Sequence, residues 1–199
     1  MQRGDQISSG AGIHTGILRP DRGGKEADAL GDIPVSPADR GERSRPEGGK
    51  GQGNNEKGLR GEAEKMVLID TGPLVALFDE TEPAHKHCYA TMQKQAEAPL
   101  TTWPVLTEAF HLLGGWERGQ SKLWDFLLAG GIHVGDIPEE LHSRIGELMK
   151  KYSDNPMDLT DASLVAIAEY HHIKKIFTLD RRDFSRYRPK HCTHFTVVP

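Results

Sequence analysis

The sequence predicts an α/β fold with a mainly parallel central sheet in residues 66–199. Three observations support this prediction. Short apolar runs alternate with longer segments of helical periodicity along this part of the chain. All aromatic residues lie at or after Phe78, so the apolar surface that can form a core is confined to residues 66–199. Acidic residues directly follow two of the apolar runs, and in parallel α/β proteins sites form beyond the carboxyl ends of the strands.

Residues 1–65 have a different composition. They contain 14 of the 22 glycines, 11 basic and 11 acidic residues, and only scattered aliphatic side chains. Such a segment buries too little apolar surface to offset the entropy cost of ordering it. We therefore interpret residues 1–65 as a disordered, Gly-rich and charged N-terminal extension, and residues 66–199 as one domain. We also hypothesise that Met66 is the natural initiator, which N-terminal mass spectrometry of the native protein would test.

The charge of the domain limits the ways in which it can bind a partner. It carries the whole net charge of −4, with 14 Lys and Arg against 18 Asp and Glu. This balance argues against binding nucleic acid by bulk electrostatics, but it is compatible with a site whose carboxylates are neutralised by bound cations. The two cysteines have no CxxC spacing, and no apolar stretch reaches 18 residues. We therefore expect reduced thiols, no membrane segment and a cytoplasmic location.

The first half of the domain predicts two strands and two helices. Residues 66–69, Met-Val-Leu-Ile, are aliphatic and partly β-branched, as in a buried strand, and the run ends at Asp70. Residues 73–78 predict a short helix with proline in its first turn. Residues 83–97 predict a more polar helix, and residues 99–102 a short strand.

The next part of the chain predicts three helices and one strand. Residues 104–114 and 119–129 are helical in pattern, the first with apolar side chains close to the 3.6-residue period, and each ends at a pair of glycines. Residues 132–137 predict a short strand, and residues 138–151 predict an amphipathic helix.

The last part of the domain predicts a helix and two strands. Residues 158–170 are rich in alanine and aliphatic side chains, which indicates a strong helix after the breaker Pro156. Residues 175–179 predict a strand that ends at Asp180, and residues 195–198 a last short strand. We expect the three tryptophans to pack in the core or at a dimer interface; they are Trp103, Trp116 and Trp124.

Four acidic residues are predicted to meet at one edge of the sheet. Asp70 and Asp180 follow strands, whereas Glu108 and Asp161 lie in the first turns of helices. Helix N-termini in parallel α/β folds point to the same edge as the carboxyl ends of the strands. Four carboxylates there would repel one another without a cation, and they are the ligands that Mg²⁺ or Mn²⁺ requires.

Each acid alone also has a purely structural interpretation. Asp70 is able to begin a turn, and Asp180 to cap the turn that follows it. Asp161 fits the acidic member of a capping box in which Asp158 is the N-cap. Glu108 fits a solvated helix position. The joint placement of these acids, more than any single residue, favours a metal site.

Four segments of the domain resemble the sequence motifs of the PIN-domain family, in particular those of VapC-type toxins. The segments are VLIDTGPLVALFD (67–79), TTWPVLTEAFHLL (101–113), MDLTDASLVAIAEYH (157–171) and IFTLDRRDFSRYRP (176–189). Each motif is weak by itself, but the four together, in this order and spacing, are a strong signal. The resemblance covers residues 66–199 and none of the N-terminal extension.

The resemblance implies a PIN-like three-layer α/β/α sandwich with Mg²⁺- or Mn²⁺-dependent endoribonuclease activity. It further implies that a water attacks RNA in line with the leaving 3′ oxygen, leaving 5′-phosphate and 3′-hydroxyl ends. Members of this kind are usually homodimers that a small antitoxin silences.

The resemblance also assigns roles to residues. The catalytic acids it implies are Asp70, Glu108, Asp161 and Asp180, all of them candidate metal ligands, with Asp183 joining them in some members. Glu108 is expected to bind metal or to orient the water. Thr71 and Thr178 are expected to hydrogen-bond the acids or the phosphate, and Asp158 to reach the metal through water. The basic run after Asp180 is either a solvated loop or, at Arg181, Arg182 and Arg186, a contact with RNA or the antitoxin.

Three alternatives remain open on the sequence. Residues 67–72, VLIDTG, also match the strand and Asp-Thr-Gly of retroviral-type aspartic proteases, whose fold is almost wholly β and whose activity EDTA would spare. A PIN fold can also serve as a non-catalytic binding module for RNA or protein. Finally, the nuclease could act in RNA processing outside a toxin–antitoxin pair, which an adjacent antitoxin gene would argue against.

Overall fold

The computed structural model describes residues 65–154 and 156–198, and in them one five-stranded sheet. The strand order is β3-β2-β1-β4-β5, and every neighbouring pair is parallel. The strands are β1 (Met66–Ile69), β2 (Ala98–Thr102), β3 (His133–Gly135), β4 (Lys175–Phe177) and β5 (Thr196–Val198). The prediction of a mainly parallel central sheet is confirmed. The interpretation of the N-terminal extension as disordered concerns residues that lie outside the described ones.

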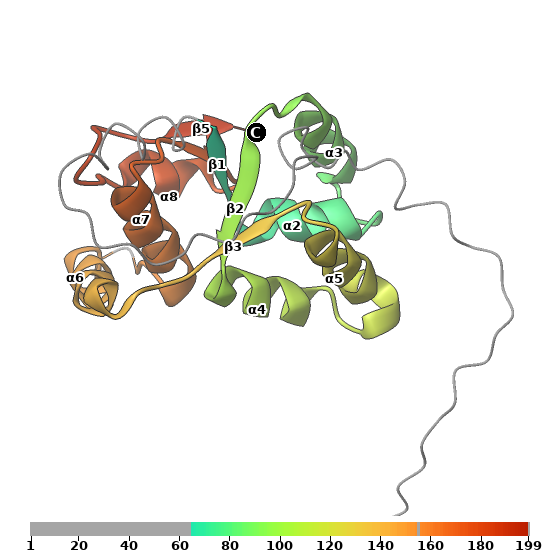
Figure 1. Cartoon of the computed structure of the whole chain (residues 1–199), viewed down its shortest axis with the longest axis horizontal. Coiled ribbons are helices and arrows are strands. Elements are labelled where there is room, and N and C mark those ends of the chain that lie inside the picture. Colours follow the sequence, from blue (N-terminus) through green and yellow to red (C-terminus); the bar gives the residue numbers. More distant parts are fainter. Residues whose placement is uncertain (1–64, 155, 199) are drawn as a thin grey trace, which may run out of the picture.

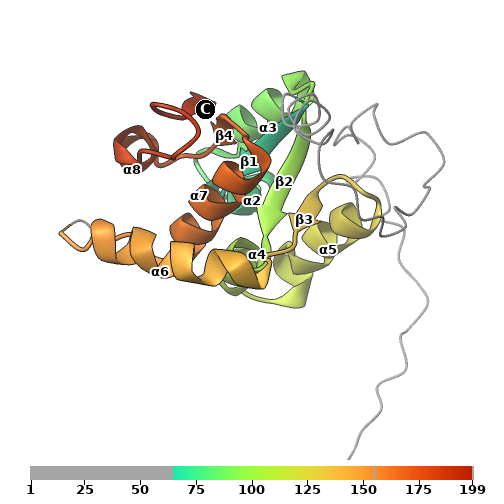
Figure 2. The same cartoon turned by 60° about the vertical axis from the view of Figure 1, so that its left-hand side comes forward.

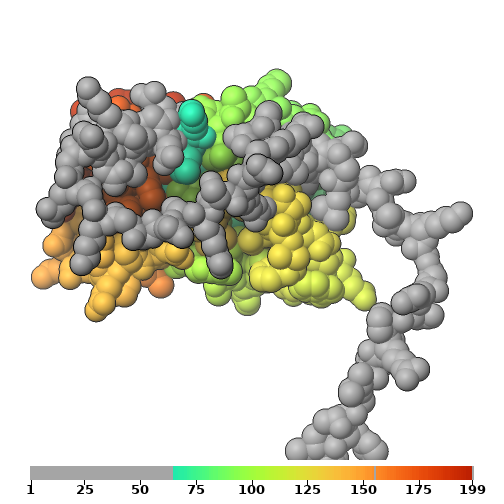
Figure 3. Space-filling view, in the orientation of Figure 1, coloured from blue at the N-terminus to red at the C-terminus, as the bar shows by residue number. Residues whose placement is uncertain are grey.

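Helices flank this sheet on both sides, which confirms the expected three-layer α/β/α sandwich. They are α2 (Thr71–Phe78), α3 (His85–Lys94), α4 (Trp103–Leu112), α5 (Gln120–Leu128), α6 (His142–Lys151), α7 (Leu159–His171) and α8 (Arg181–Arg186), with 3-10 turns η2 (Trp116–Arg118) and η3 (Glu139–Leu141). Figure 1 shows α6 and α7 on one side of the strands and α2, α3 and α5 on the other. The turned view in Figure 2 separates α6 from α7, which lies nearer the strands. In Figure 3, α6 forms the orange part of the lower surface.

The central strand β1 ends where the acidic edge begins. Val67, Leu68 and Ile69 are almost fully buried, as expected for a strand covered on both faces. The backbone N–H of Asp70 still donates to the carbonyl of Phe177 at 3.0 Å, so hydrogen bonding between β1 and β4 continues up to that residue. The backbone of Asp70 is therefore fixed by the sheet itself.

Helix α7 is buried along its middle. Its residues 162–168 are all buried, because it packs against β2, α4 and α6. Near its start, the hydroxyls of Ser163 and Thr102 are 2.6 Å apart, so the first turns of α7 lie at the carboxyl end of β2. This contact places the N-terminus of α7 at the same edge as Asp70.

The structure corrects several expectations about individual segments. The basic run after Asp180 begins with a helix, α8, where a loop was one of the two interpretations. The helix expected over residues 138–151 begins as the 3-10 turn η3, and α6 starts only at His142. The core prediction for the tryptophans is wrong, since 52%, 56% and 37% of the surface of Trp103, Trp116 and Trp124 is exposed.

Helices make up much of the described chain, which is incompatible with the almost wholly β fold of the retroviral-type aspartic proteases. In the described residues, no helix combines the length and apolar character needed to cross a bilayer. Cys88 is buried, Cys192 is partly exposed, and both are free thiols.

Candidate active site

Three aspartates begin three different helices at the carboxyl edge of the sheet. Asp70 caps α2, Asp158 caps α7 and Asp180 caps α8. Each carboxylate accepts a backbone N–H from the first turn of its own helix, at 2.7, 2.8 and 2.9 Å respectively. Capping stabilises a negative charge at a helix N-terminus, and it also fixes where the carboxylate lies. The strand–helix junctions of the fold thus bring acids from distant parts of the chain to one edge.

Asp70 is the most deeply buried of these acids, with 8% of its surface exposed. One carboxylate oxygen accepts the Thr71 N–H, and the other accepts the hydroxyl of Thr178 at 2.7 Å. Burial raises the pKa of Asp70 to about 6, against the two hydrogen bonds, and the nearby carboxylates of Glu108 and Asp158 add to the rise. The environment of Asp70 is therefore one that favours a bound positive charge.

Glu108 reaches the same edge from α4. Its carboxylate accepts the hydroxyl of Thr71 at 2.7 Å, so the first residue of α2 orients the acid of α4. Glu108 is partly buried and raises the pKa of Asp70 through its charge. The hydrogen bonds predicted from Thr71 and Thr178 to the acids are thus both present.

Asp161 lies in the first turn of α7 and interacts with three other acids. Burial raises its pKa to about 7, and the charges of Asp70, Asp158 and Asp180 add to the rise. Opposing them is one hydrogen bond, in which the Tyr187 hydroxyl donates to the carboxylate at 2.7 Å. Asp161 is therefore close to Asp70, Asp158 and Asp180.

Asp180 and Asp183 lie at the start of α8. The Asp180 N–H donates to the Thr178 hydroxyl oxygen at 2.9 Å, so Thr178 contacts both Asp70 and Asp180. The Asp180 side chain is exposed. Asp183, three residues further along, forms an ion pair with Arg186 at 3.7 Å. Its carboxylate is thus partly engaged by its own helix.

The acids that the sequence indicated form one cluster, which we call the acidic cluster. It consists of Asp70, Glu108, Asp158, Asp161 and Asp180. Within the described residues, no cationic side chain is among the groups that set the pKa of Asp70 or Asp161. An all-oxygen donor set of this kind suits a hard divalent cation such as Mg²⁺ or Mn²⁺.

The acidic cluster is not a ready-made coordination sphere. Across residues 65–154 and 156–198, no three His, Cys, Asp or Glu side chains are arranged closely enough to hold a metal ion as they stand. The residues present therefore fit a divalent cation in their chemistry, and their side chains would have to draw together around it.

No pattern in the sequence singles out Tyr187, which contacts Asp161 directly. Tyr187 follows α8 in the basic run, 26 residues after its partner, and no spacing rule connects the two positions. The arginines of the same run have different surroundings. Arg181 and Arg182 are exposed beside Asp180, whereas Arg186 pairs with Asp183.

The sequence matches a known family model and is similar to a known ribonuclease. A family model described as PIN domain matches residues 67–189. The chain is 33% identical over 140 residues to the Ribonuclease VapC26 of Mycobacterium tuberculosis, an alignment that covers 67% of this chain and all of that protein.

Two solved structures are also similar. One is the crystal structure of Mycobacterium tuberculosis VapC20, described as a sarcin–ricin loop cleaving toxin, with 18% identity and a TM-score of 0.54 over 58% of this chain and 91% of that chain. The other is a toxin–antitoxin complex from Klebsiella pneumoniae, with 17% identity and a TM-score of 0.48 over 67% of this chain and 96% of that chain. At these identities the first likeness concerns the fold alone.

Proposed function

The chain belongs to the PIN-domain family, and from this premise we propose that it is a divalent-metal-dependent endoribonuclease, the toxin of a toxin–antitoxin pair. The observation that carries the proposal is the acidic cluster, five carboxylates at the carboxyl edge of a parallel sheet, none of which forms an ion pair with a cationic side chain in residues 65–154 and 156–198. The 33% identity to a protein named as a ribonuclease supports RNA as the substrate.

In this proposal, Asp70, Asp161 and Asp180 hold Mg²⁺ or Mn²⁺, joined by Asp183. When bound, the cation supplies positive charge that stabilises the phosphate as negative charge develops on it. Glu108 shares in holding the cation or accepts a hydrogen bond from the attacking water.

The hydroxyl groups around the cluster orient these acids. Thr71 holds Glu108 and Thr178 holds Asp70, each through a hydrogen bond of 2.7 Å. Each of these hydrogen bonds uses one lone pair of a carboxylate oxygen, and the remaining lone pairs point in other directions, from which the cation can be bound. We propose Asp158 as an outer member of the cluster that contacts the cation through water, since its own oxygen caps α7.

Helix α8 offers the positive charge that the cluster lacks. Arg181 and Arg182 are exposed and directly follow Asp180, which suits contact with RNA phosphates on either side of the cleaved bond. The same arginines and the pair of Arg186 with Asp183 suit contact with an antitoxin. A homodimer and a cytoplasmic location complete the proposal, on the family resemblance.

The test is cleavage of labelled total RNA by the purified full chain, free of any antitoxin. We expect cleavage with Mg²⁺ or Mn²⁺, none with EDTA, and none in Asp70→Asn. The matched control is Asp125→Asn, which changes an exposed aspartate on α5 and should leave cleavage intact. Cleavage that survives in Asp70→Asn would disprove the site, and a folded chain that binds RNA without cutting it under any metal would indicate a binding module.

A further inference from the structure

The side chain of Tyr187 is held almost completely inside the protein, with 1% of its surface exposed. Its ring packs at near right angles on Phe184, with centroids 5.2 Å apart, and at 63° on Tyr152, with centroids 5.1 Å apart. Aromatic pairs of this geometry favour one ring orientation. The hydroxyl is therefore carried on a ring that has little freedom to turn.

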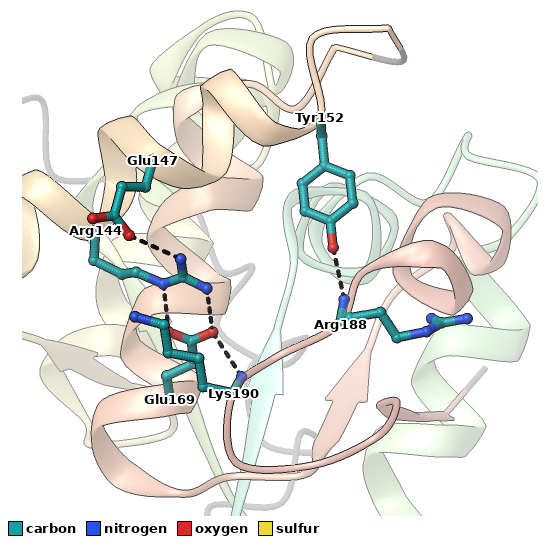
Figure 4. Close-up of polar contacts among 6 residues, drawn as sticks. All are labelled: Arg144, Glu147, Tyr152, Glu169, Arg188 and Lys190. Carbon is teal, nitrogen blue, oxygen red and sulfur yellow. Dashed lines mark hydrogen bonds and ion pairs between the residues drawn. The ribbon is translucent and has the colours of Figure 1, made fainter.

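The backbone around Tyr187 is fixed as well. Its own N–H donates to the Asp183 carbonyl at 3.1 Å and closes α8. The next residue, Arg188, donates its N–H to the hydroxyl of Tyr152 at 2.9 Å, as Figure 4 shows. The segment that carries Tyr187 is thus bound to the end of α6.

A second attachment lies two residues further on. The N–H of Lys190 donates to the Glu169 carboxylate at 2.9 Å, and the Arg144 guanidinium binds the same carboxylate through two hydrogen bonds of 2.8 Å (Figure 4). Glu169 belongs to α7, the helix that also carries Asp161. The segment after α8 is therefore tied to the helix whose acid Tyr187 contacts.

The hydroxyl of Tyr187 completes a pattern in the acidic cluster. Three of the cluster's carboxylates each accept one hydroxyl hydrogen bond of 2.7 Å. The pairs are Thr71–Glu108, Thr178–Asp70 and Tyr187–Asp161. Thr71 directly follows Asp70 and Thr178 directly follows β4, so both lie at the ends of sheet strands, whereas Tyr187 comes from a separate segment held by α6 and α7. Nothing else in the described residues donates a side-chain hydrogen bond to Asp161.

We propose that Tyr187 is a positioning residue: its hydroxyl, on a ring packed by Phe184 and Tyr152, holds the Asp161 carboxylate in the orientation that receives the divalent cation. Its effect on cation binding and cleavage rests on the proposed function. Its effect on the Asp161 side chain does not. Removal of the hydroxyl frees the Asp161 carboxylate to rotate. The cation must then fix the orientation of this carboxylate as it binds, and this weakens cation binding.

The test compares Tyr187→Phe with Tyr170→Phe in the full chain. Both lose one hydroxyl, but Tyr170 is exposed at the end of α7 and its ring contacts His171. The first readout is the carboxyl signal of Asp161 in protein labelled with ¹³C-aspartate, without metal, identified by its loss in Asp161→Asn. We expect this signal to shift in Tyr187→Phe and to stay unchanged in Tyr170→Phe.

The second readout is Mn²⁺ binding by calorimetry together with RNA cleavage over a range of Mn²⁺ concentrations. We expect Tyr187→Phe to raise the Mn²⁺ dissociation constant about 10-fold, the low end for partners that orient metal ligands. Cleavage by the variant should approach the wild-type rate at saturating Mn²⁺. An effect on packing alone would lower thermal stability and leave the dissociation constant unchanged.

The outcomes separate the two proposals. An Asp161 signal and a dissociation constant that match those of Tyr170→Phe would overturn the role of Tyr187. A wild-type chain that neither binds Mn²⁺ nor cuts RNA would overturn the proposed function, and the metal-free signal of Asp161 would still decide the role of Tyr187. If Tyr187→Phe unfolds in part, a double-mutant cycle in thermal unfolding with Asp161→Ala, which removes the acceptor of the hydroxyl bond, provides the decision, since no coupling would contradict a direct contact.

Discussion

Thr178 links two acids of the cluster through a single hydroxyl group. It donates to Asp70 and accepts the N–H of Asp180, and its side chain is fully buried. A buried carboxylate that loses its donor has no water to replace it, so the cost of losing this hydroxyl is larger than that of an ordinary surface hydrogen bond. The same atom that stabilises the fold at this edge therefore also orients an active-site acid.

We expect Thr178→Val to destabilise the protein by about 2 kcal/mol, because valine keeps the shape of threonine but leaves the buried Asp70 carboxylate without its hydroxyl donor and the Asp180 N–H without its acceptor. Urea denaturation measures this change, and RNA cleavage should fall in the same variant. Thr107→Val is the matched control: its hydroxyl is exposed and bonds only to the Trp103 carbonyl within α4. Equal losses of stability in the two variants would contradict the role given to Thr178.

Asp161→Asn should have opposite effects on stability and activity. The charges of Asp70, Asp158 and Asp180 work against an ionised Asp161, and its pKa is raised to about 7 after burial is included. Asparagine removes one of these neighbouring negative charges and can still accept the hydrogen bond from the Tyr187 hydroxyl. We expect the metal-free protein to gain about 1 kcal/mol of stability while cleavage is lost, in line with the usual effect of relieving strain at a functional site.

Thermal unfolding in chelator, with Asp125→Asn as the control, checks this prediction. Added Mg²⁺ should raise the unfolding temperature of the wild type more than that of Asp161→Asn, because only a ligand bound to the folded state stabilises it. A variant that is less stable than the wild type without metal would show that the carboxylates do not repel one another in the folded protein.

At the scale of elements, α6 and α7 are joined by one partly buried ion pair. Partial burial acts to raise the pKa of Glu169, but the hydrogen bonds from the Arg144 guanidinium and the Lys190 N–H outweigh it, so the pKa lies below its usual value. The folded state therefore binds a proton at Glu169 less readily than the unfolded state does. The pair stabilises the protein above the unfolded pKa of Glu169, and this stability is lost as the pH falls through the folded pKa.

We therefore expect Glu169→Gln to lower the unfolding free energy by about 2 kcal/mol at pH 7, since hydrogen bonds to charged groups contribute this much. The difference from the wild type should shrink as the pH falls below about 4, the range in which a glutamate of ordinary pKa takes up its proton. Urea denaturation at several pH values measures this. A difference that stays constant down to pH 3 would mean that the ion pair contributes little. Glu147→Gln, on the exposed partner of Arg144, is the matched control.

The strands and most helices could be predicted because each carries its own signal. The continuous aliphatic run of β1 indicates a buried strand, and the alanine and aliphatic side chains of α7 indicate a buried helix. Helix α8 could not be separated from a loop, because six residues with only Phe184 buried are too short to show a period. The start of α6 was placed too early, since Pro138 precedes a 3-10 turn that sequence periodicity does not distinguish from an α-helix.

The candidate site, like the fold, could be predicted only in part. The acids could be placed at one edge because strand ends and helix starts meet there in any parallel α/β sheet. Tyr187 could not, because its contact with Asp161 depends on how α8 and the segment after it fold back onto α7. Likewise, the exposure of the tryptophans depends on which faces of α4 and α5 other elements cover.

At the scale of the whole molecule, all aromatic residues and most of the aliphatic ones lie in residues 66–199. We expect residues 65–199 to fold without residues 1–64 and to unfold in one transition, with the same unfolding free energy as the full chain. Urea denaturation followed by tryptophan fluorescence, which reports only on this part since all three tryptophans lie in it, compares the two. A shorter chain that is markedly less stable would show that the N-terminal segment contributes to the fold.

The last strand, β5, has a consequence for the time at which the protein first becomes active. The carbonyl of Val198 accepts the N–H of Thr178, at the end of the strand β4 that β5 borders, and Thr178 holds Asp70. Until β5 has paired with β4 during folding, this edge of the sheet lacks its outer strand and Thr178 lacks this backbone partner. We therefore expect the proposed enzyme to begin cutting RNA only once β5 is in place.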